Sequence, residues 1–67
     1  MKGIIQVNEK EYPFTITRYD HTGKWKFIYM YNENNQPFAE IAIPMYAQKN
    51  SCFEMNDSHY KIIEMED

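Results

Sequence analysis

The sequence predicts an all-β fold, an antiparallel meander of five to six short strands that curls into a small barrel or half-barrel. Short segments in which apolar and polar residues alternate with a period of two recur along the chain. Clusters of Asn, Asp, Ser, Pro and Gly separate these segments, as expected for hairpin turns. A chain of 67 residues has room for one domain, so residues 1–67 are expected to form a single β-rich domain.

The first predicted hairpin joins a strand over residues 4–7 to a strand over residues 12–19. Apolar residues alternate with threonines in the centre of the second strand, which is typical of a strand with one buried face. A polar turn over residues 8–11 connects the two strands. Pairing around this turn places the apolar side chains on one face, through the pairs Val7–Tyr12, Ile5–Phe14 and Gly3–Ile16.

A third strand is predicted over residues 25–31. Both of its faces carry apolar residues, which favours a central place in the sheet. One face is an aromatic row, made of Trp25, Phe27, Tyr29 and Tyr31. Whether this row lies in the core or on an open surface depends on the length of the preceding turn, which begins at Asp20.

Two turn lengths give opposite answers for the aromatic row. A four-residue turn pairs Ile16 with Phe27 and directs the row toward the core. A three-residue turn pairs Ile16 with Ile28 and directs the row outward. We favour the four-residue turn, because it sets Arg18 against Trp25 in a favourable cation–π contact.

The fourth strand is predicted over residues 38–43, and Pro44 ends it. Glu40 is the one acidic residue inside this apolar strand, which indicates the exposed face of an edge strand. The following segment, residues 44–50, is expected to form one helical turn with the proline at its start.

A last hairpin is predicted between strands over residues 52–56 and 59–63, around a two-residue turn at Asp57–Ser58. This register sets an opposite-charge pair on one face and two apolar pairs on the other. Each such pair stabilises the sheet by roughly 0.2–1 kcal/mol. The predicted pairs are Glu54–Lys61, Met55–Tyr60 and Phe53–Ile62.

Composition restricts the class of protein. The formal net charge of −3 argues against general nucleic-acid binding, which normally relies on a basic face. Cys52 is the only cysteine, which excludes a disulfide within the monomer and fits a reducing compartment. The N-terminal residues lack the apolar run of a signal peptide, and no stretch approaches the ~20 apolar residues of a membrane span. We therefore expect a cytoplasmic protein with no membrane association.

The sequence offers no convincing catalytic or cofactor site. Cys52 and His59 would lie about 13 Å apart along a hairpin, too far for a nucleophile and its base. Gly3 and Gly23 are the only glycines, so no glycine-rich phosphate loop is present. The remaining candidate metal ligands match no known zinc or calcium spacing, and we expect no enzyme activity, no cofactor and no metal. These candidates are His21, His59, Asp20, Asp57 and Cys52.

Cations and aromatic residues interleave on the third strand and across the preceding turn. Small β-barrels bind single-stranded nucleic acid through such platforms, which makes this the first alternative function. A small-ligand or metal-binding β-barrel is the second alternative. The candidate binding residues are Arg18, Tyr19, Lys24, Trp25, Lys26, Tyr29 and Tyr31.

Protein binding is the function that the sequence favours most. The chain has more Trp, Tyr, Phe and Met than a core of this size readily hides, and such residues are enriched at the centres of interfaces. Strand edges also offer backbone pairing to another chain. We therefore expect a non-enzymatic protein-binding or regulatory module that acts through a β-sheet surface or edge, as a homodimer.

Overall fold

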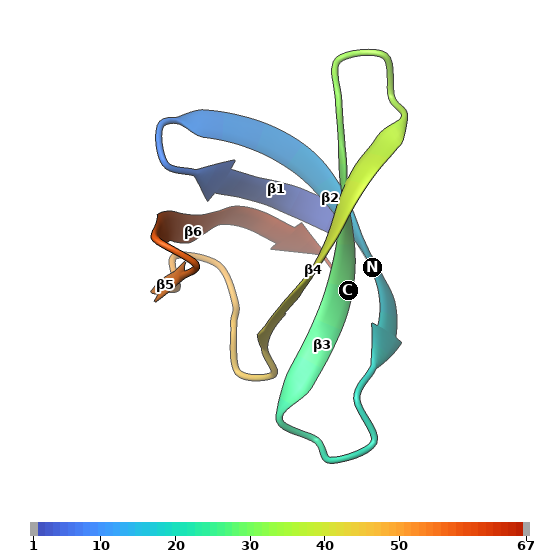
Figure 1. The fold of residues 1–67 in the computed structure, drawn as a ribbon, viewed down its shortest axis with the longest axis vertical. Coiled ribbons are helices and arrows are strands. Elements are labelled where there is room, and N and C mark those ends of the chain that lie inside the picture. Colours follow the sequence, from blue (N-terminus) through green and yellow to red (C-terminus); the bar gives the residue numbers. More distant parts are fainter. Residues whose placement is uncertain (1, 67) are drawn as a thin grey trace.

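The protein is an all-β structure, as the sequence predicts. A computed structural model describes residues 2–66, and within them six antiparallel strands form one sheet that curls into a half-barrel (Figure 1). The strand order is β4-β3-β2-β1-β6-β5. The strands are β1 (Lys2–Val7), β2 (Lys10–Tyr19), β3 (Trp25–Tyr31), β4 (Pro37–Pro44), β5 (Cys52–Met55) and β6 (Ser58–Glu66).

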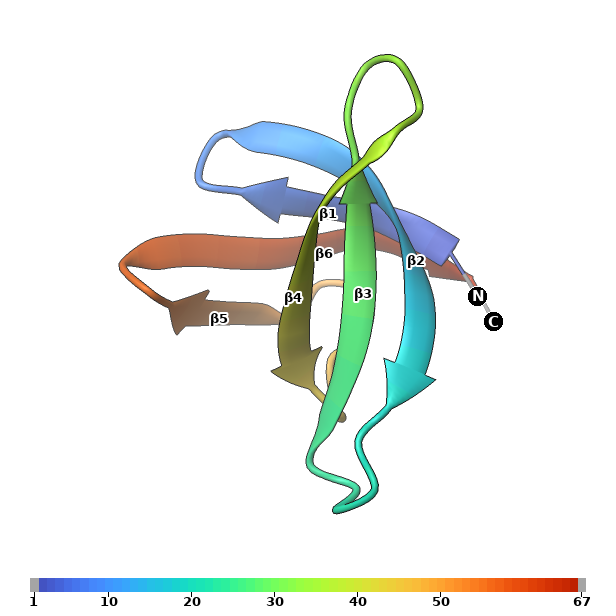
Figure 2. The ribbon, with the colours of Figure 1, turned by 45° about the vertical axis from the view of Figure 1, so that its right-hand side comes forward.

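The long strand β2 joins the two parts of the curled sheet. Its first residues pair with β1, and its last residues pair with β3. Figure 2 shows β3 and β4 running beside the last part of β2, while β1 and β6 cross behind them and β5 lies beside β6. The sheet therefore folds over itself and encloses a core between two crossed three-stranded parts, with β4 and β5 at its two ends.

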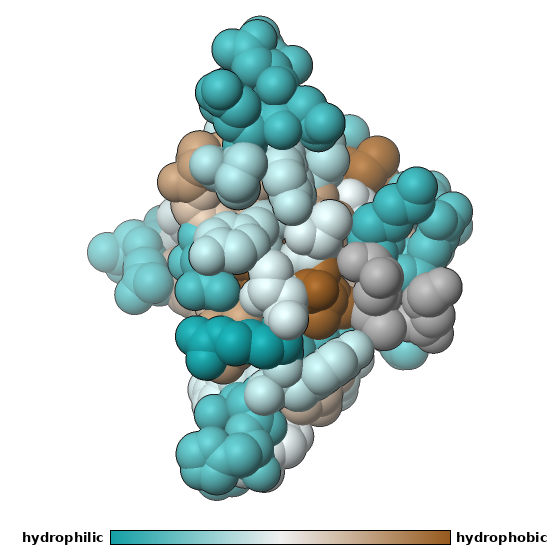
Figure 3. Space-filling view, turned by 90° about the vertical axis from the view of Figure 1, so that its right-hand side faces the viewer, coloured by the Kyte–Doolittle hydropathy of each residue, from teal (hydrophilic) through white to brown (hydrophobic). Residues whose placement is uncertain are grey.

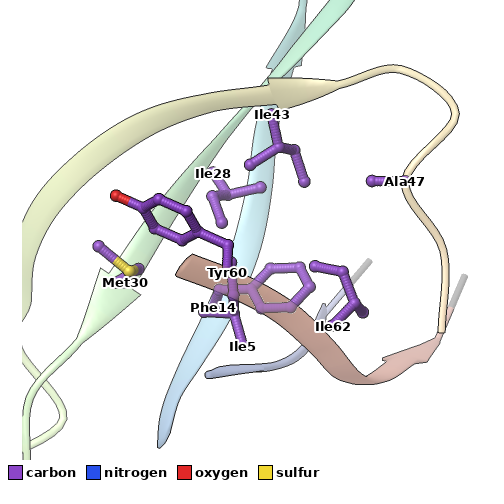
Figure 4. Packing of buried hydrophobic residues seen from close by; sticks show 8 residues of the cluster. All are labelled: Ile5, Phe14, Ile28, Met30, Ile43, Ala47, Tyr60 and Ile62. Atoms are coloured by element: carbon purple, nitrogen blue, oxygen red, sulfur yellow. The ribbon is translucent and has the colours of Figure 1, made fainter. Parts of the chain in front are cut away.

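Most core side chains come from alternate positions on the inner face of the sheet, and Ala47 joins them from the segment after β4 (Figure 4). Each fully buried isoleucine or phenylalanine side chain stabilises the fold by about 1.5–3 kcal/mol. The buried hydrophobic residues are Ile5, Phe14, Ile28, Met30, Ile43, Ala47, Tyr60 and Ile62.

Gly3 allows the closest approach within this core. A Cβ atom at this position would overlap the backbone oxygen of Glu64 and lie 2.7 Å from the ring of Phe14. The aromatic ring thus occupies the space that a side chain on β1 would need, in the middle of the sheet.

The predicted registers of the first and last hairpins are wrong by two residues. In the β1–β2 hairpin, Ile5 pairs with Tyr12 rather than Phe14, because the turn consists of residues 8 and 9 alone. Asn8 has a φ of 58°, as the first central position of a type II′ turn requires. A shift of two residues leaves each side chain on its predicted face.

The β5–β6 hairpin differs from its prediction in the same way. Asn56 and Asp57 form the turn with φ values of 52° and 66°, the left-handed pair that a type I′ turn needs. Glu54 therefore pairs with His59 rather than Lys61, and Phe53 pairs with Tyr60.

The favoured register of the β2–β3 hairpin is also wrong, and this error changes faces. Ile16 pairs with Ile28, not with Phe27. The loop extends over residues 20–24, where Gly23 adopts a φ of 77°. A bulge at Thr17 absorbs one residue between the loop and the body of the sheet. The aromatic row of β3 consequently faces outward.

The helical turn expected near residues 44–50 is absent. Ala47 N donates to Pro44 O at 3.0 Å and Ser51 N donates to Gln48 O at 2.9 Å, which makes two consecutive β-turns. The edge position predicted for the strand that carries Glu40 is confirmed. The described residues form no helix that could span a membrane.

Candidate protein-interaction surface

The outer face of β3 presents the aromatic row to the surroundings. Burial alternates along β3, so that its even-numbered residues face the core and its odd-numbered residues face outward. Trp25 is 42% exposed and Tyr29 is 38% exposed. We call Trp25, Phe27, Tyr29 and Tyr31 the outer aromatic row. Figure 3 shows this side of the molecule as a pale band of intermediate hydropathy between hydrophilic loops.

An ion pair lies across the middle of this row. The guanidinium of Arg18 packs 3.9 Å from the centre of the Phe27 ring, and its Nη2 lies 3.9 Å from Oε1 of Glu40. Thr17 donates its hydroxyl to Oε2 of Glu40 at 3.3 Å. The three strands β2, β3 and β4 thus contribute to one polar cluster that covers part of the aromatic surface.

The seven candidate binding residues do not all share this surface. Arg18, Trp25, Tyr29 and Tyr31 lie on the outer face, where the hydroxyls of Tyr31 and Thr15 are 3.0 Å apart. These four residues form one continuous region across β2 and β3.

The other three candidates lie elsewhere. Lys26 is only 6% exposed, and its Nζ donates to Ala47 O at 2.8 Å on the inner side of the sheet. Tyr19 pairs with Lys26 at the end of β2, and Lys24 belongs to the exposed loop before β3. The alternation of cations and aromatics along β3 therefore separates the two residue types onto opposite faces.

The free edge of β4 borders the outer aromatic row. Met45 N donates to Lys24 O at 3.0 Å, which makes these two residues a hydrogen-bonded pair. Bonded pairs recur every second residue, so Ile41 and Ile43 bond to β3. The backbone groups of Glu40 and Ala42 then point away from β3, toward the side where β4 ends the sheet.

A groove of about 610 Å³ lies along this edge. One wall consists of outer-face residues, and the other consists of residues from the inner side, near the β5–β6 turn. We call it the edge groove. Its lining residues are Asp20, Trp25, Phe27, Glu40, Ile41, Ala42, Met55, Asn56 and Tyr60.

Of the residues that line this groove, the sequence had indicated only Trp25 as a binding residue. Glu40 carried a usable signal, because an acid within an apolar strand indicates an edge. Met55 and Tyr60 carried none, since only the curling of the sheet brings the β5–β6 turn close to β4. Ala42 was missed because its importance lies in its backbone.

The remaining chemical groups do not assemble a second site. His59 Nδ1 lies 3.0 Å from Oε1 of Glu54, while Cys52 pairs with Lys61 further along the hairpin. Residues 2–66 contain no group of three or more His, Cys, Asp or Glu side chains that could hold a metal ion.

Comparisons with protein-family models, with curated proteins and with solved structures gave no match to this chain. Its function is therefore inferred from the geometry of the fold.

Proposed function

We propose that this chain is a small protein-binding module that accepts an extended strand of its partner at the free edge of β4. The single observation that carries the proposal is the outer side of β4, which pairs with no strand among the described residues and lies along a groove lined in part by aromatic residues. Strand addition supplies backbone hydrogen bonds for affinity, and neighbouring pockets supply specificity.

The shape of the edge supports this mode of binding. β4 has eight residues, enough for a partner strand, and Pro37 and Pro44 mark its two ends. Prolines lack the N–H that a further strand would need, so they restrict pairing to the segment between them. Trp25 and Phe27 lie beside that segment and belong to residue types enriched in interfaces.

Single-stranded nucleic acid is a weaker candidate for the same surface. Stacking needs accessible ring faces and nearby cations. Arg18 already covers Phe27, and Glu40 lies beside it with a negative charge. Lys26, which would have added a second cation, is buried on the other face.

A peptide selection tests the proposal. Random twelve-residue peptides displayed on phage are selected on the immobilised chain, and enriched peptides are titrated into ¹⁵N-labelled protein. We expect the largest amide shifts at Glu40 and Ala42. Ala42→Pro is expected to weaken binding at least about tenfold, because it removes an outward donor and obstructs the edge.

The second sheet edge provides the matched control. Glu54→Pro makes the equivalent change on β5 and is expected to leave peptide affinity within about twofold. Well-dispersed amide resonances in ¹⁵N NMR spectra of both variants establish that each is folded. Peptides that bind the Ala42→Pro variant as tightly as the original chain, or a selection that enriches no peptide, would refute edge pairing.

A further inference from the structure

A strand added to β4 would present its side chains alternately to two different environments. Successive side chains of a strand point to opposite faces. Those on the inner side would lie beside Ile41 and the β5–β6 turn. Those on the outer side would lie beside Glu40 and Ala42, next to the outer aromatic row. The chemistry of the two walls therefore restricts the partner.

The inner wall of the edge groove is apolar. Ile41 and Met55 are half-buried and pack against the core, and the buried Tyr60 lines the same groove. An apolar side chain entering here would extend the core, whereas a charged one would lose hydration without gaining a partner. Every second residue of the partner strand is therefore expected to be apolar.

The outer wall is acidic and aromatic. Among the described residues that line the groove, Asp20 and Glu40 are carboxylates, and none is a lysine, arginine or histidine. Arg18 remains 3.9 Å from Glu40, beyond hydrogen-bond distance, so this carboxylate can still accept a closer cation. The exposed ring of Trp25 offers a second contact for a cation.

Ala42 adds a steric argument. Its small side chain lies opposite Phe27 and leaves space on the outer side for a long partner side chain. Arg18 already covers Phe27, so a lysine or arginine placed there can pack its aliphatic stem on the exposed ring of Trp25 and keep its charged end near Glu40.

From these walls we infer that the partner strand alternates apolar with basic residues, an inference that rests on the proposed edge pairing. The apolar residues fill the inner side of the edge groove, and the basic residues lie along its outer side. The net charge of −3 favours the approach of such a segment at low salt.

Three capped eight-residue peptides test this inference. One alternates valine and lysine, one alternates valine and glutamate, and one contains the valines and lysines in two separate blocks. Trp25 is the only tryptophan and lies in the groove, so its fluorescence reports binding directly. We expect the alternating lysine peptide to bind at least about tenfold more tightly than either of the other two.

Variants of the chain show which residues of the edge groove bind the lysine peptide. Glu40→Gln keeps the size of the side chain and is expected to weaken the lysine peptide about threefold, since an exposed ion pair contributes about this much. Glu33→Gln, in the β3–β4 loop, is the matched charge control and is expected to change nothing measurable. Ala42→Pro is expected to abolish the fluorescence change.

The outcomes separate this inference from the proposal on which it rests. Equal affinity for the lysine and glutamate peptides would overturn the charge requirement, and equal affinity for the block peptide would overturn the alternation. Displayed peptides of another composition that depend on Ala42 would overturn the inference and leave edge pairing intact. So would a homodimer, detected by sedimentation velocity, that Ala42→Pro dissociates, because the occupant of the edge would then be a second copy.

Discussion

The two ends of the sheet are built differently. The edge strand β4 has eight residues, an apolar composition and one acid, whereas β5 has only four residues. Turns confine β5 on both sides, with Asn50 and Asn56 at φ values of 74° and 52°. Its exposed Glu54 lies with Oε1 3.0 Å from Nδ1 of His59.

This difference distinguishes a protected edge from an open one. Short strands and charged side chains are common means of preventing unwanted pairing at an edge. Each edge strand carries one glutamate, but β5 is also only four residues long, whereas β4 is eight residues long and is limited only at its ends, by two prolines. The contrast explains why we assign partner binding to β4, and it can be tested through the stability of each edge.

The largest effect is expected where β4 is anchored to the core. Ile43 is fully buried and packs with Ile28 and Ala47. Ile43→Ala should lower the free energy of unfolding by about 3 kcal/mol, because it removes buried methyl groups and leaves a cavity. Urea unfolding monitored by Trp25 fluorescence measures this change. A loss below about 1 kcal/mol would mean that β4 is not firmly held, and the groove beside it would not be preformed.

Phe53 provides the corresponding test on β5 and should show a smaller effect. Its half-buried ring stacks on Tyr60, with centroids 5.5 Å apart and planes at 12°. Phe53→Ala should cost about 2 kcal/mol, less than a fully buried phenylalanine would. The same urea experiment measures it. If this variant proves less stable than Ile43→Ala, the shorter edge is the more important one for the fold.

The sequence predicted the faces of the first and last hairpins better than their registers. Alternation constrains which side of a strand is buried, and a shift of two residues does not alter it. The register depended on the left-handed conformations of Asn8 and Asn56, which asparagine permits at several positions in a polar turn. The pattern alone could not choose among them.

The site was harder to predict than the fold, for two physical reasons. The bulge at Thr17 shifts β3 by one residue, and such a shift exchanges the two faces of a strand. Whether the aromatic row faces outward or into the core therefore depended on one irregular position. The edge groove depended on curvature, because Met55 and Ile41 line one groove only when the whole sheet curls.

A glycine substitution in the turn beside β5 should produce a modest gain in stability. Asp57 holds a φ of 66°, a conformation that costs a non-glycine residue roughly 1 kcal/mol. Asp57→Gly places a residue without a Cβ there and should raise the free energy of unfolding by about 0.5 kcal/mol, after the entropy of glycine in the unfolded chain is included. Urea midpoints compared with those of Asp57→Ala measure the difference. A destabilised glycine variant would show that the aspartate side chain itself supports the turn.

The smallest effect is expected for the contact between Glu54 on β5 and His59. Glu54→Gln should change the free energy of unfolding by less than about 0.5 kcal/mol, because both side chains are largely exposed and solvent screens the pair. The charge should matter more for association, since an uncharged short edge has lost one of its barriers to pairing. We therefore expect Glu54→Gln to leave urea unfolding unchanged while raising concentration-dependent association in sedimentation velocity. If the variant associates no more than the original chain, the shortness of β5 alone protects this edge, and its charge is dispensable.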